Sequence, residues 1–276
     1  MSQDEPRFRG FAQLVGEQSF SRIASSSVCV IGLGGVGSWV VEALARCGIG
    51  AVSLVDLDEV CITNVNRQLH ALSDHVGKPK ADLLRDRVMQ INPGCNVLSV
   101  RKFFTRENAD QILLPEYDLI IDTIDSVDHK TDLILECVYR DLPVITAGSG
   151  GERLNPLSIK LADLAYTEYD PLLQIVRKRL RQQHDFPRGE RGRFDIPCVY
   201  APLQRGPRRP AGCEVEEGES KTRKSCNDGL GSAVFMTGSM GFVVASEAVR
   251  LLSLDSRSPA YSWKEKRWGG QRPPVI

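Results

Sequence analysis

Closely spaced cysteine pairs are absent from this sequence, although its 276 residues include eight cysteines. A four-thiolate zinc site needs paired thiolates, because one short loop must present two of them to a tetrahedral ion. The scattered spacing therefore argues against a structural zinc, and we expect none. Isolated thiols among apolar residues are most simply core side chains. The cysteines are Cys29, Cys47, Cys61, Cys95, Cys137, Cys198, Cys213 and Cys226.

The sequence also shows no secretory signal segment, no internal repeat and no heptad pattern. We therefore expect a cytoplasmic protein whose cysteines stay reduced. Charge is absent over one long stretch, residues 229–246, whose length would just permit a membrane span. Four glycines and several hydroxyl side chains lower its hydrophobicity. We expect a buried helix there and no association with a membrane.

Net charge is lacking as well, since 35 basic side chains balance 35 acidic ones. The balance hides two opposed halves. Residues 1–170 carry 16 basic and 24 acidic side chains, whereas residues 171–276 carry 19 and 11. Such a distribution leaves room for a polyanionic partner on the C-terminal side, although an ordinary solvated surface would also show it.

Strand and helix patterns alternate along the first half of the chain. Short apolar runs bounded by turn residues indicate buried parallel strands, and the segments between them have helical periodicity. This alternation predicts an α/β fold with a Rossmann-like, doubly wound and mainly parallel sheet. The expected strands are 28–32, 52–56, 97–100, 119–122 and 143–146, and the expected helices are 7–26, 36–47, 78–91 and 129–140.

The remainder of the chain predicts a helical and irregular C-terminal extension. Residues 172–183 indicate a basic helix, whereas residues 184–225 are rich in Pro, Gly, Arg and Glu without a long apolar run, which is typical of a loop. We expect a single domain over residues 1–276. Its nucleotide-binding core would be 8–165, and the basic part, 166–276, would complete the fold.

A glycine-rich turn follows the first expected strand and opens a helix. It is Gly32-Leu-Gly34-Gly35-Val-Gly37. Glycine lets the backbone turn tightly and lets a phosphate approach main-chain N–H groups, where the helix dipole adds positive charge. Asp56 ends the next strand, at the spacing of an acid that binds ribose hydroxyls. The pattern predicts a nucleotide site, but it fits both a nicotinamide cofactor and ATP.

A second set of polar residues separates these two nucleotides. Hydride transfer needs no cationic groups around the phosphates, whereas nucleotidyl transfer does, because charge spreads over the phosphate oxygens as pyrophosphate leaves. Arg67 offers a planar fork for phosphate oxygens and Lys80 a point charge, while Asp125 offers a hard oxygen ligand for Mg²⁺. Taken singly, these residues also suit a surface ion pair, a helix-start charge and a helix N-cap. The set is Asp56, Asp58, Asn64, Arg67, Gln68, Lys80, Asp122, Asp125 and Ser126.

In this order, the glycine motif and the second set resemble the ThiF-like adenylating superfamily of ubiquitin-activating, molybdopterin-biosynthesis and thiamine-biosynthesis enzymes. The similarity covers about residues 8–165. It implies adenylation of a carboxylate with ATP and Mg²⁺, with Arg67, Lys80 and Asp125 as catalytic residues and the other motif residues binding ATP. Members usually carry two CxxC pairs for zinc and often a cysteine that forms a thioester, and these pairs are missing here.

Further segments closely resemble one branch of this superfamily, the tRNA threonylcarbamoyladenosine dehydratases. They extend the similarity over nearly the whole chain. The resemblance implies ATP-dependent cyclisation of the threonylcarbamoyl group on the adenosine 3′ to the anticodon. It also implies a homodimer. In some relatives an arginine reaches the partner's site, and whether Arg67 does so here stays open. The resemblance also allows a sulfur-transfer partner such as a cysteine desulfurase system. The segments are Arg7-Phe-Arg-Gly10, Asn66-Arg-Gln-Leu-His-Ala71, Gln90-Ile-Asn-Pro93, Ile124-Asp-Ser126, Asp163–Leu172 and Cys226–Ala233, together with the lone Cys198.

The implied chemistry is consistent with the chemical nature of the substrate. A threonine carboxylate is a poor electrophile, and transfer of AMP to its oxygen creates a good leaving group. A neighbouring group of the same modification then attacks intramolecularly, which benefits from high effective molarity, so no enzyme nucleophile is required. A thioester step through Cys198 or Cys226 stays open as an alternative.

The basic C-terminal half gains a function under this interpretation. Ten basic and three acidic side chains lie between Arg177 and Arg209. Such a cluster can follow the tRNA backbone, with binding that weakens as salt rises. A solvated helix face followed by a loop is the simpler alternative. The candidate tRNA contacts are Arg177, Lys178, Arg179 and Arg181.

Three other functions stay open at this stage. A Rossmann oxidoreductase would bind a nicotinamide cofactor and consume no ATP, but it would leave Arg67, Lys80 and Asp125 without a role. An activator of a ubiquitin-like or sulfur-carrier protein would adenylate a C-terminal Gly-Gly. An RNA-binding module on an inactive nucleotide fold would bind tRNA without turnover.

Overall fold

A computed structural model of the chain describes residues 6–189, 192–203 and 231–254. Its centre is a seven-stranded sheet in the order β3-β2-β1-β4-β5-β7-β6. Neighbouring strands are parallel except for the β6–β7 pair. This order confirms the predicted doubly wound, mainly parallel sheet. The strands are β1 (Ser27–Ile31), β2 (Ala51–Val55), β3 (Asn96–Val100), β4 (Leu119–Asp122), β5 (Val144–Ala147), β6 (Lys160–Asp163) and β7 (Pro197–Tyr200).

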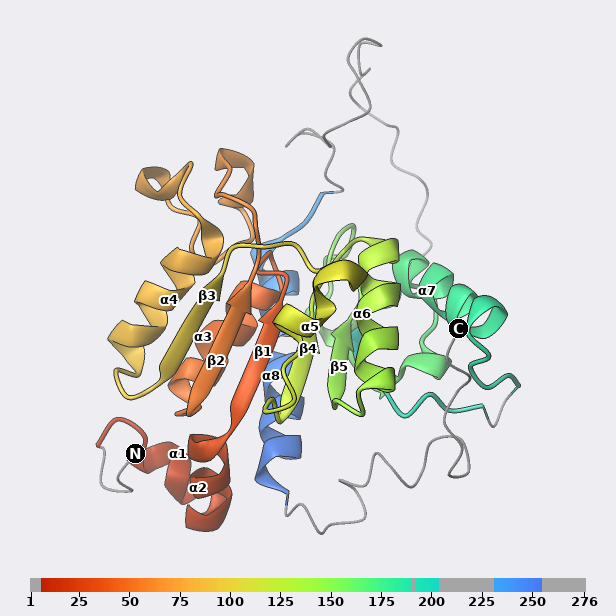
Figure 1. Ribbon diagram of the computed structural model, residues 1–276. Coiled ribbons are helices and arrows are strands. Elements are labelled where there is room, and N and C mark those ends of the chain that lie inside the picture. The colour runs from red at the N-terminus through yellow and green to blue at the C-terminus, as the bar shows by residue number, and fades with distance from the viewer. Residues whose placement is uncertain (1–5, 190–191, 204–230, 255–276) are drawn as a thin grey trace.

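Helices cover both faces of the sheet (Figure 1). α2, α3, α4 and α8 contribute to the core on one face, and α5, α6 and α7 to the core on the other. The α-helices are α1 (Arg9–Val15), α2 (Glu17–Ser25), α3 (Gly37–Arg46), α4 (Lys80–Ile91), α5 (Ala109–Ile112), α6 (Val127–Tyr139), α7 (Pro171–Gln183) and α8 (Val234–Ser253). The short 3-10 helices are η1 (Ile62–Asn64), η2 (Ser73–His75), η3 (Arg106–Asn108), η4 (Pro156–Ser158) and η5 (Leu164–Tyr166).

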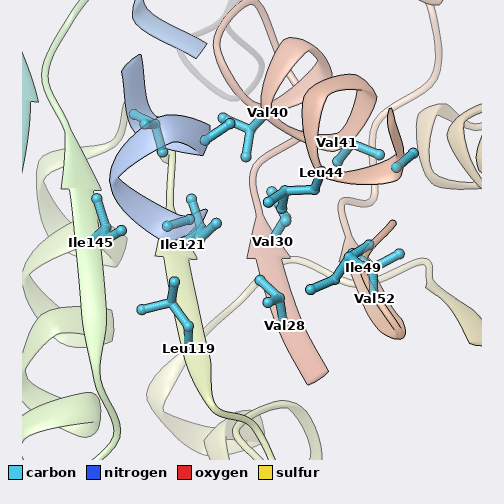
Figure 2. Packing of buried hydrophobic residues seen from close by; sticks show 14 of the residues in the cluster. Val28, Val30, Val40, Val41, Leu44, Ile49, Val52, Leu119, Ile121 and Ile145 are labelled. Atoms are coloured by element: carbon cyan, nitrogen blue, oxygen red, sulfur yellow. The ribbon is translucent and has the colours of Figure 1, made fainter. Parts of the chain in front are cut away.

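The two layers of helices explain why the central strands are continuous apolar runs. Val28 and Val30 of β1 point to the same side as Leu119 and Ile121 of β4, where α3 packs over them (Figure 2). The residues between them, such as Cys29, belong to the core on the opposite face. Because both faces are buried, an alternation of polar and apolar residues is not required in these strands.

The lead-in helix predicted over 7–26 is two helices instead of one. Gly16 separates α1 from α2 and has φ 85°, a backbone conformation that residues other than glycine rarely adopt. The apolar spacing continues across the break, which is why periodicity did not reveal it.

Two strands lie in segments where no strand was predicted. β7 comes from the stretch predicted to be irregular, and it lies between β5 and β6 in the sheet. β6 has no continuous apolar run, because it begins with a lysine, ends with an aspartate and is only partly buried. β7 begins with a proline inside the Pro-, Gly- and Arg-rich stretch. The C-terminal part of the chain therefore contributes directly to the sheet that carries the glycine motif.

The uncharged run from Val234 onward lies in the core helix α8, as predicted, and the helix continues to Ser253. This helix is long and apolar enough to cross a membrane, but 56% of the apolar stretch is buried in the fold. Its glycines allow a close approach to α3, since a Cβ at Gly241 would lie 2.7 Å from Cβ of Trp39 and 2.8 Å from the Val36 carbonyl oxygen. Packing on α3 accounts for the apolar composition without a membrane.

Candidate active site

The glycine motif forms a tight turn between β1 and α3. Gly32 has φ 89°, and a Cβ at Gly37 would lie 2.0 Å from the Gly32 carbonyl oxygen. Neither position tolerates a side chain without distortion. No side chain caps the N-terminus of α3, and the N–H groups of Ser38 and Trp39 already donate to the carbonyl oxygens of Gly34 and Val36. The N–H groups of the glycine turn just before them are therefore the ones that an anionic ligand would meet, as the sequence predicts.

Asp56 follows β2 and supports this turn from the neighbouring strand. Its Oδ2 accepts a hydrogen bond from the Leu33 N–H at 2.7 Å, and its Oδ1 accepts one from the Asp58 N–H at 2.8 Å. Burial raises the pKa of the Asp56 carboxyl group, and the Lys80 ammonium opposes that shift. The acid and the glycine turn are therefore one unit, at the place where a ribose acceptor was predicted.

Lys80 is nearly buried at the N-terminus of α4, where the helix dipole disfavours a cation. Its Nζ donates to Asp58 Oδ2 at 2.8 Å, and 51% of the Asp58 side chain is exposed. An ammonium group has three donor hydrogens, so others can reach an incoming anion. A helix-start charge does not explain this placement, because a solvated lysine would need no carboxylate partner.

The loop after η1 holds Arg67 next to the glycine turn. A Cβ at Gly35 would lie 3.5 Å from Arg67 Cγ. Arg67 Nη1 donates to Thr63 O at 2.8 Å and to Asn66 Oδ1 at 3.0 Å. Neither partner is a carboxylate, so the guanidinium is not committed to a surface ion pair within the described part of the chain.

Two buried polar side chains in this loop have unsatisfied atoms. Gln68 Oε1 and both ring nitrogens of His70 have no hydrogen-bond partner among the described residues. Burial lowers the pKa of His70 to about 3, and the charge of Lys80 contributes to the shift, so the imidazole is neutral. Unsatisfied buried polar atoms are costly and are typical of a place where a ligand or water binds. Asn64 instead supports the loop, since its Oδ1 accepts from the Cys61 N–H at 3.0 Å.

The turn after β4 carries Asp125 and is fixed by a buried charge network. Asp122 is fully buried: its Oδ2 accepts from Lys130 Nζ and from Thr146 Oγ1, each at 2.7 Å, and its Oδ1 accepts from the Ile124 N–H at 3.0 Å. These contacts give Asp122 a supporting role, which differs from the direct ATP contact that we predicted.

Asp125 itself is exposed and is not the cap of α6. The N-cap is Ser126, whose side chain makes no capping hydrogen bond. The same turn contacts the glycine motif, because Thr123 Oγ1 donates to Gly32 O at 2.5 Å. The carboxylate of Asp125 is therefore available to a ligand next to the glycine turn.

These segments meet at the carboxyl ends of β1, β2 and β4. Strand order reverses between β1 and β4, which is where open α/β sheets bind their ligands. The structure thus brings the glycine turn into contact with Asp56, with the loop of Arg67 and with the turn before Asp125. Asp58 connects Lys80 to the same unit, because its N–H donates to Asp56 and its carboxylate accepts from Lys80 Nζ.

Comparison with known proteins identifies the family of the chain. Residues 9–266 match the ThiF family. The chain belongs to the ThiF family. It is 40% identical to the Escherichia coli tRNA threonylcarbamoyladenosine dehydratase over 247 residues, which cover 88% of this chain and 92% of the relative. It is also 27% identical to the Haemophilus influenzae molybdopterin-synthase adenylyltransferase, but over only 46% of this chain and 52% of the relative.

A solved structure extends this similarity to three dimensions. The crystal structure of the Escherichia coli tRNA N6-threonylcarbamoyladenosine dehydratase in complex with ATP superimposes with a TM-score of 0.78 at 38% identity. The match covers 91% of this chain and 96% of that chain. The similarity in structure thus extends along most of the length of both proteins.

The metal expected in this ThiF-family site suits the carboxylate that is present. Among the residues that the structure describes, no group of three or more His, Cys, Asp and Glu side chains gathers as a metal site. Mg²⁺ needs no such cluster, because it is commonly held by one or two carboxylates together with substrate phosphates and water. The exposed Asp125 fits that arrangement.

The position of Cys198 does not suit a nucleophile. Its thiol is fully buried in β7 between β5 and β6, and burial raises the pKa of Cys198 well above its usual range. A nucleophilic cysteine needs access and a stabilised thiolate. Cys226, the other candidate, lies outside the described residues.

We predict that Cys198→Ala retains at least half of the rate of AMP formation. The substitution should cost about 1 kcal/mol of stability, because it removes one buried sulfur atom. The rate is measured at a temperature where circular dichroism shows the variant to be folded. A loss of more than 100-fold in that folded protein would instead support a thioester step.

The four basic residues of α7 proposed to contact tRNA do not share one orientation. Arg177 Nη1 donates to Thr167 Oγ1 at 2.6 Å, and burial lowers the pKa of Arg177. Arg181 Nη2 donates to Ala165 O at 3.1 Å. These two arginines support the fold, which periodicity alone did not indicate. Lys178 is exposed, and Arg179 pairs with a carboxylate at the surface.

Several residues that shape the site were not predicted. Lys130 was not singled out, although its position eight residues after Asp122, on the helix that follows β4, is compatible with an ion pair. Asn66 was part of a motif but was given no role. Trp39 and Thr237 contact the backbone of Arg67 from α3 and α8, and no sequence signal connects them to it.

Proposed function

We propose that the protein binds ATP and Mg²⁺ and cyclises N6-threonylcarbamoyladenosine next to the anticodon of tRNA. This proposal rests mainly on how much of both chains the similarity to the dehydratases covers. That similarity spans nearly the full length of both chains, whereas the similarity to the molybdopterin-synthase adenylyltransferase covers under half of this chain. If only the nucleotide-binding core were shared, the chain would match the dehydratase and the adenylyltransferase over similar lengths. The additional similarity in the C-terminal part therefore favours tRNA as the substrate.

The proposed nucleotide contacts follow from the geometry of the site. The glycine turn and the N-terminus of α3 approach the phosphates with backbone N–H groups, and Asp56 accepts from the ribose hydroxyls. Arg67 and Lys80 supply positive charge to the phosphate oxygens. Since the site is partly buried, each of these charges acts in a lower dielectric than water.

Adenylation is an in-line exchange at the α-phosphorus. An oxygen of the threonine carboxylate forms a bond to that phosphorus while the bond to the bridging oxygen of pyrophosphate breaks. Negative charge grows on the leaving pyrophosphate, and Arg67 and Lys80 are placed to stabilise it. Mg²⁺ held by Asp125 and the phosphates would neutralise further charge.

Ring closure completes the reaction without a nucleophile from the enzyme. A neighbouring group of the modification attacks the activated acyl carbon and displaces AMP. The tRNA loses one water overall, and the driving force is the conversion of ATP to AMP and pyrophosphate. Tethering of the two reacting groups provides the effective molarity.

One assay tests this function directly. The protein is incubated with MgATP and tRNA that carries the threonylcarbamoyl modification, and AMP is measured together with the mass of the nucleoside. We expect AMP and a nucleoside lighter by one water. AMP formed only in the presence of a small protein ending in Gly-Gly would contradict the proposal and favour activation of a carrier protein.

We further predict that reversing Lys178, which is exposed, and Arg179, which pairs with Asp128 at the surface, weakens tRNA binding selectively. The double variant Lys178→Glu/Arg179→Glu should raise the KM for tRNA roughly tenfold at low salt and leave the KM for ATP unchanged, because phosphate contacts supply much of the affinity. The variant avoids Arg177 and Arg181, whose contacts belong to the fold. Steady-state kinetics at several salt concentrations measures both constants.

The matched control reverses two adjacent cations at the opposite edge of the sheet, Arg101 and Lys102, which are both exposed. It should change the KM for tRNA less than twofold. Equal effects of the two double variants would assign the change to net charge and not to a tRNA surface on α7.

We also propose that the protein acts in the cytoplasm as a homodimer, as its resemblance to the dehydratases implies. The same resemblance is compatible with a sulfur-transfer partner. Sedimentation equilibrium distinguishes the dimer from a monomer.

A further inference from the structure

The segment from Gly231 to Thr237 contacts two loops, the one that follows β5 and the one that carries Arg67. Gly231 O accepts from the Glu152 N–H at 2.7 Å, in the loop that follows β5. Ser232 O accepts from Asn66 Nδ2 at 3.0 Å, and Thr237 Oγ1 donates to Arg67 O at 3.2 Å. The first turn of α8 is therefore more than the start of a core helix, because it connects the Arg67 loop to the rest of the site.

Thr237 is the most closely packed residue that we describe in this segment. Its side chain is almost fully buried, and its methyl group lies between two glycine turns. A Cβ at Gly35 would lie 3.0 Å from Thr237 Cγ2, and one at Gly150 would lie 2.9 Å from it. Only glycine at both positions lets the turn of β1 and the turn after β5 close on the same methyl group.

The backbone of Arg67 is held from two helices. Its carbonyl oxygen accepts from Trp39 Nε1 of α3 at 3.1 Å and from the Thr237 hydroxyl of α8 at 3.2 Å. The hydroxyl of Thr237 also lies 3.4 Å from Ala233 O and from Val234 O in its own helix. The carbonyl of Arg67 is therefore the nearest of its three acceptors.

The guanidinium of Arg67 is held through the same segment. Ser232 O orients the amide of Asn66, since it accepts from Nδ2 and so turns Oδ1 toward Arg67. That Oδ1 accepts from Arg67 Nη1. Both the backbone and the side chain of Arg67 thus depend on residues just before and within the first turn of α8.

We propose that Thr237 is a positioning residue for Arg67, acting through the Arg67 carbonyl and not by contact with the substrate. This inference rests on the proposed function, in which Arg67 stabilises the leaving pyrophosphate. A displaced guanidinium loses most of its effect on the transition state, since a shift of about 1 Å can cost up to 100-fold in rate. The ground-state binding of ATP depends on many other contacts and changes less.

The test compares two substitutions at one position. Thr237→Val keeps the shape and removes the hydroxyl, and we expect kcat for AMP formation to fall roughly tenfold with less than a twofold change in the KM for ATP. Thr237→Ser keeps the hydroxyl and should restore most of the rate. As a matched control, Thr131→Val removes a buried hydroxyl that donates within α6, to Val127 O at 2.7 Å, and has no other hydrogen-bond partner among residues 6–189, 192–203 and 231–254; it should have little effect.

A double-mutant cycle separates positioning from a general structural effect. In an Arg67→Ala background, Thr237→Val should lower the rate less than twofold further, because there is no guanidinium left to position. A tenfold further loss in that background, or full activity of Thr237→Val alone, would overturn the inference.

A spectroscopic readout keeps this inference separate from the proposed function. In the ¹H–¹⁵N spectrum of the ATP-bound protein, the Nε–H resonance of Arg67 should shift in Thr237→Val and not in Thr237→Ser. A shift in a protein that makes no AMP would retain the positioning role and reject the dehydratase function. Unchanged Arg67 resonances in Thr237→Val would reject the positioning role.

Discussion

Replacing Lys80 with methionine should lower the rate of AMP formation by a factor of about 100 to 1,000, the loss typical of removing one charged donor from a developing anion. Methionine keeps much of the length and apolar stem of lysine, so packing at the start of α4 is retained. The ammonium of Lys80 is held next to Asp58, and Arg67 is the other cation that we assign to the phosphates. Pyrophosphate release measures the rate.

Lys78 offers a matched control two residues before Lys80. It is exposed and precedes the helix, so Lys78→Met removes a charge from the same segment without entering the site. This variant should retain nearly full activity, and both proteins should unfold within a few degrees of the native chain. A Lys80→Met protein that is folded and has more than a third of the native rate would rule out the proposed role.

The central part of the fold follows from the sequence, because each step is local. The run Leu119–Asp122 is apolar up to its last residue and is bounded by turns, and it forms β4 within the predicted limits. The glycine turn is predictable because only glycine satisfies its φ angle and its close contacts. The acid after β2 meets that turn because the carboxyl ends of parallel strands lie at one edge.

The parts that the sequence did not reveal depend on tertiary contacts. Asp122 looks like a site carboxylate, but a buried lysine from the next helix turns it into a support. Arg177 looks like a solvated cation, but Thr167 in a preceding turn captures it. The sequence does not show that Lys130 and Thr167 are the partners of these two residues. Counting charged side chains therefore overestimated the number that are available to ligands.

The buried charge network also explains how an exposed side chain can be positioned accurately. Asp122 and Lys130 lie 2.7 Å apart with no exposure, in a setting where an unpaired charge would cost several kcal/mol. Their contacts fix the backbone at Ile124. The rigid support therefore ends one residue before Asp125, whose carboxylate remains in solvent contact.

Replacing Asp125 with asparagine should therefore reduce AMP formation about 100-fold or more and raise the Mg²⁺ concentration needed for half-maximal rate. The amide has the shape of the carboxylate, and because Asp125 is exposed and does not cap α6, the fold should be unaffected. The asparagine amide, however, lacks the negative charge that a hard divalent cation prefers. The measurement is the initial rate across a Mg²⁺ titration at constant ATP. Asp128→Asn, which removes an exposed acid from the first turn of the same helix, is the control. Because Asp128 pairs with Arg179, this control is measured at saturating tRNA, where it should leave the Mg²⁺ dependence unchanged. Equal Mg²⁺ curves for the two variants would mean that Asp125 does not hold the metal, and loss of ATP affinity without Mg²⁺ would point to a contact with the nucleotide itself.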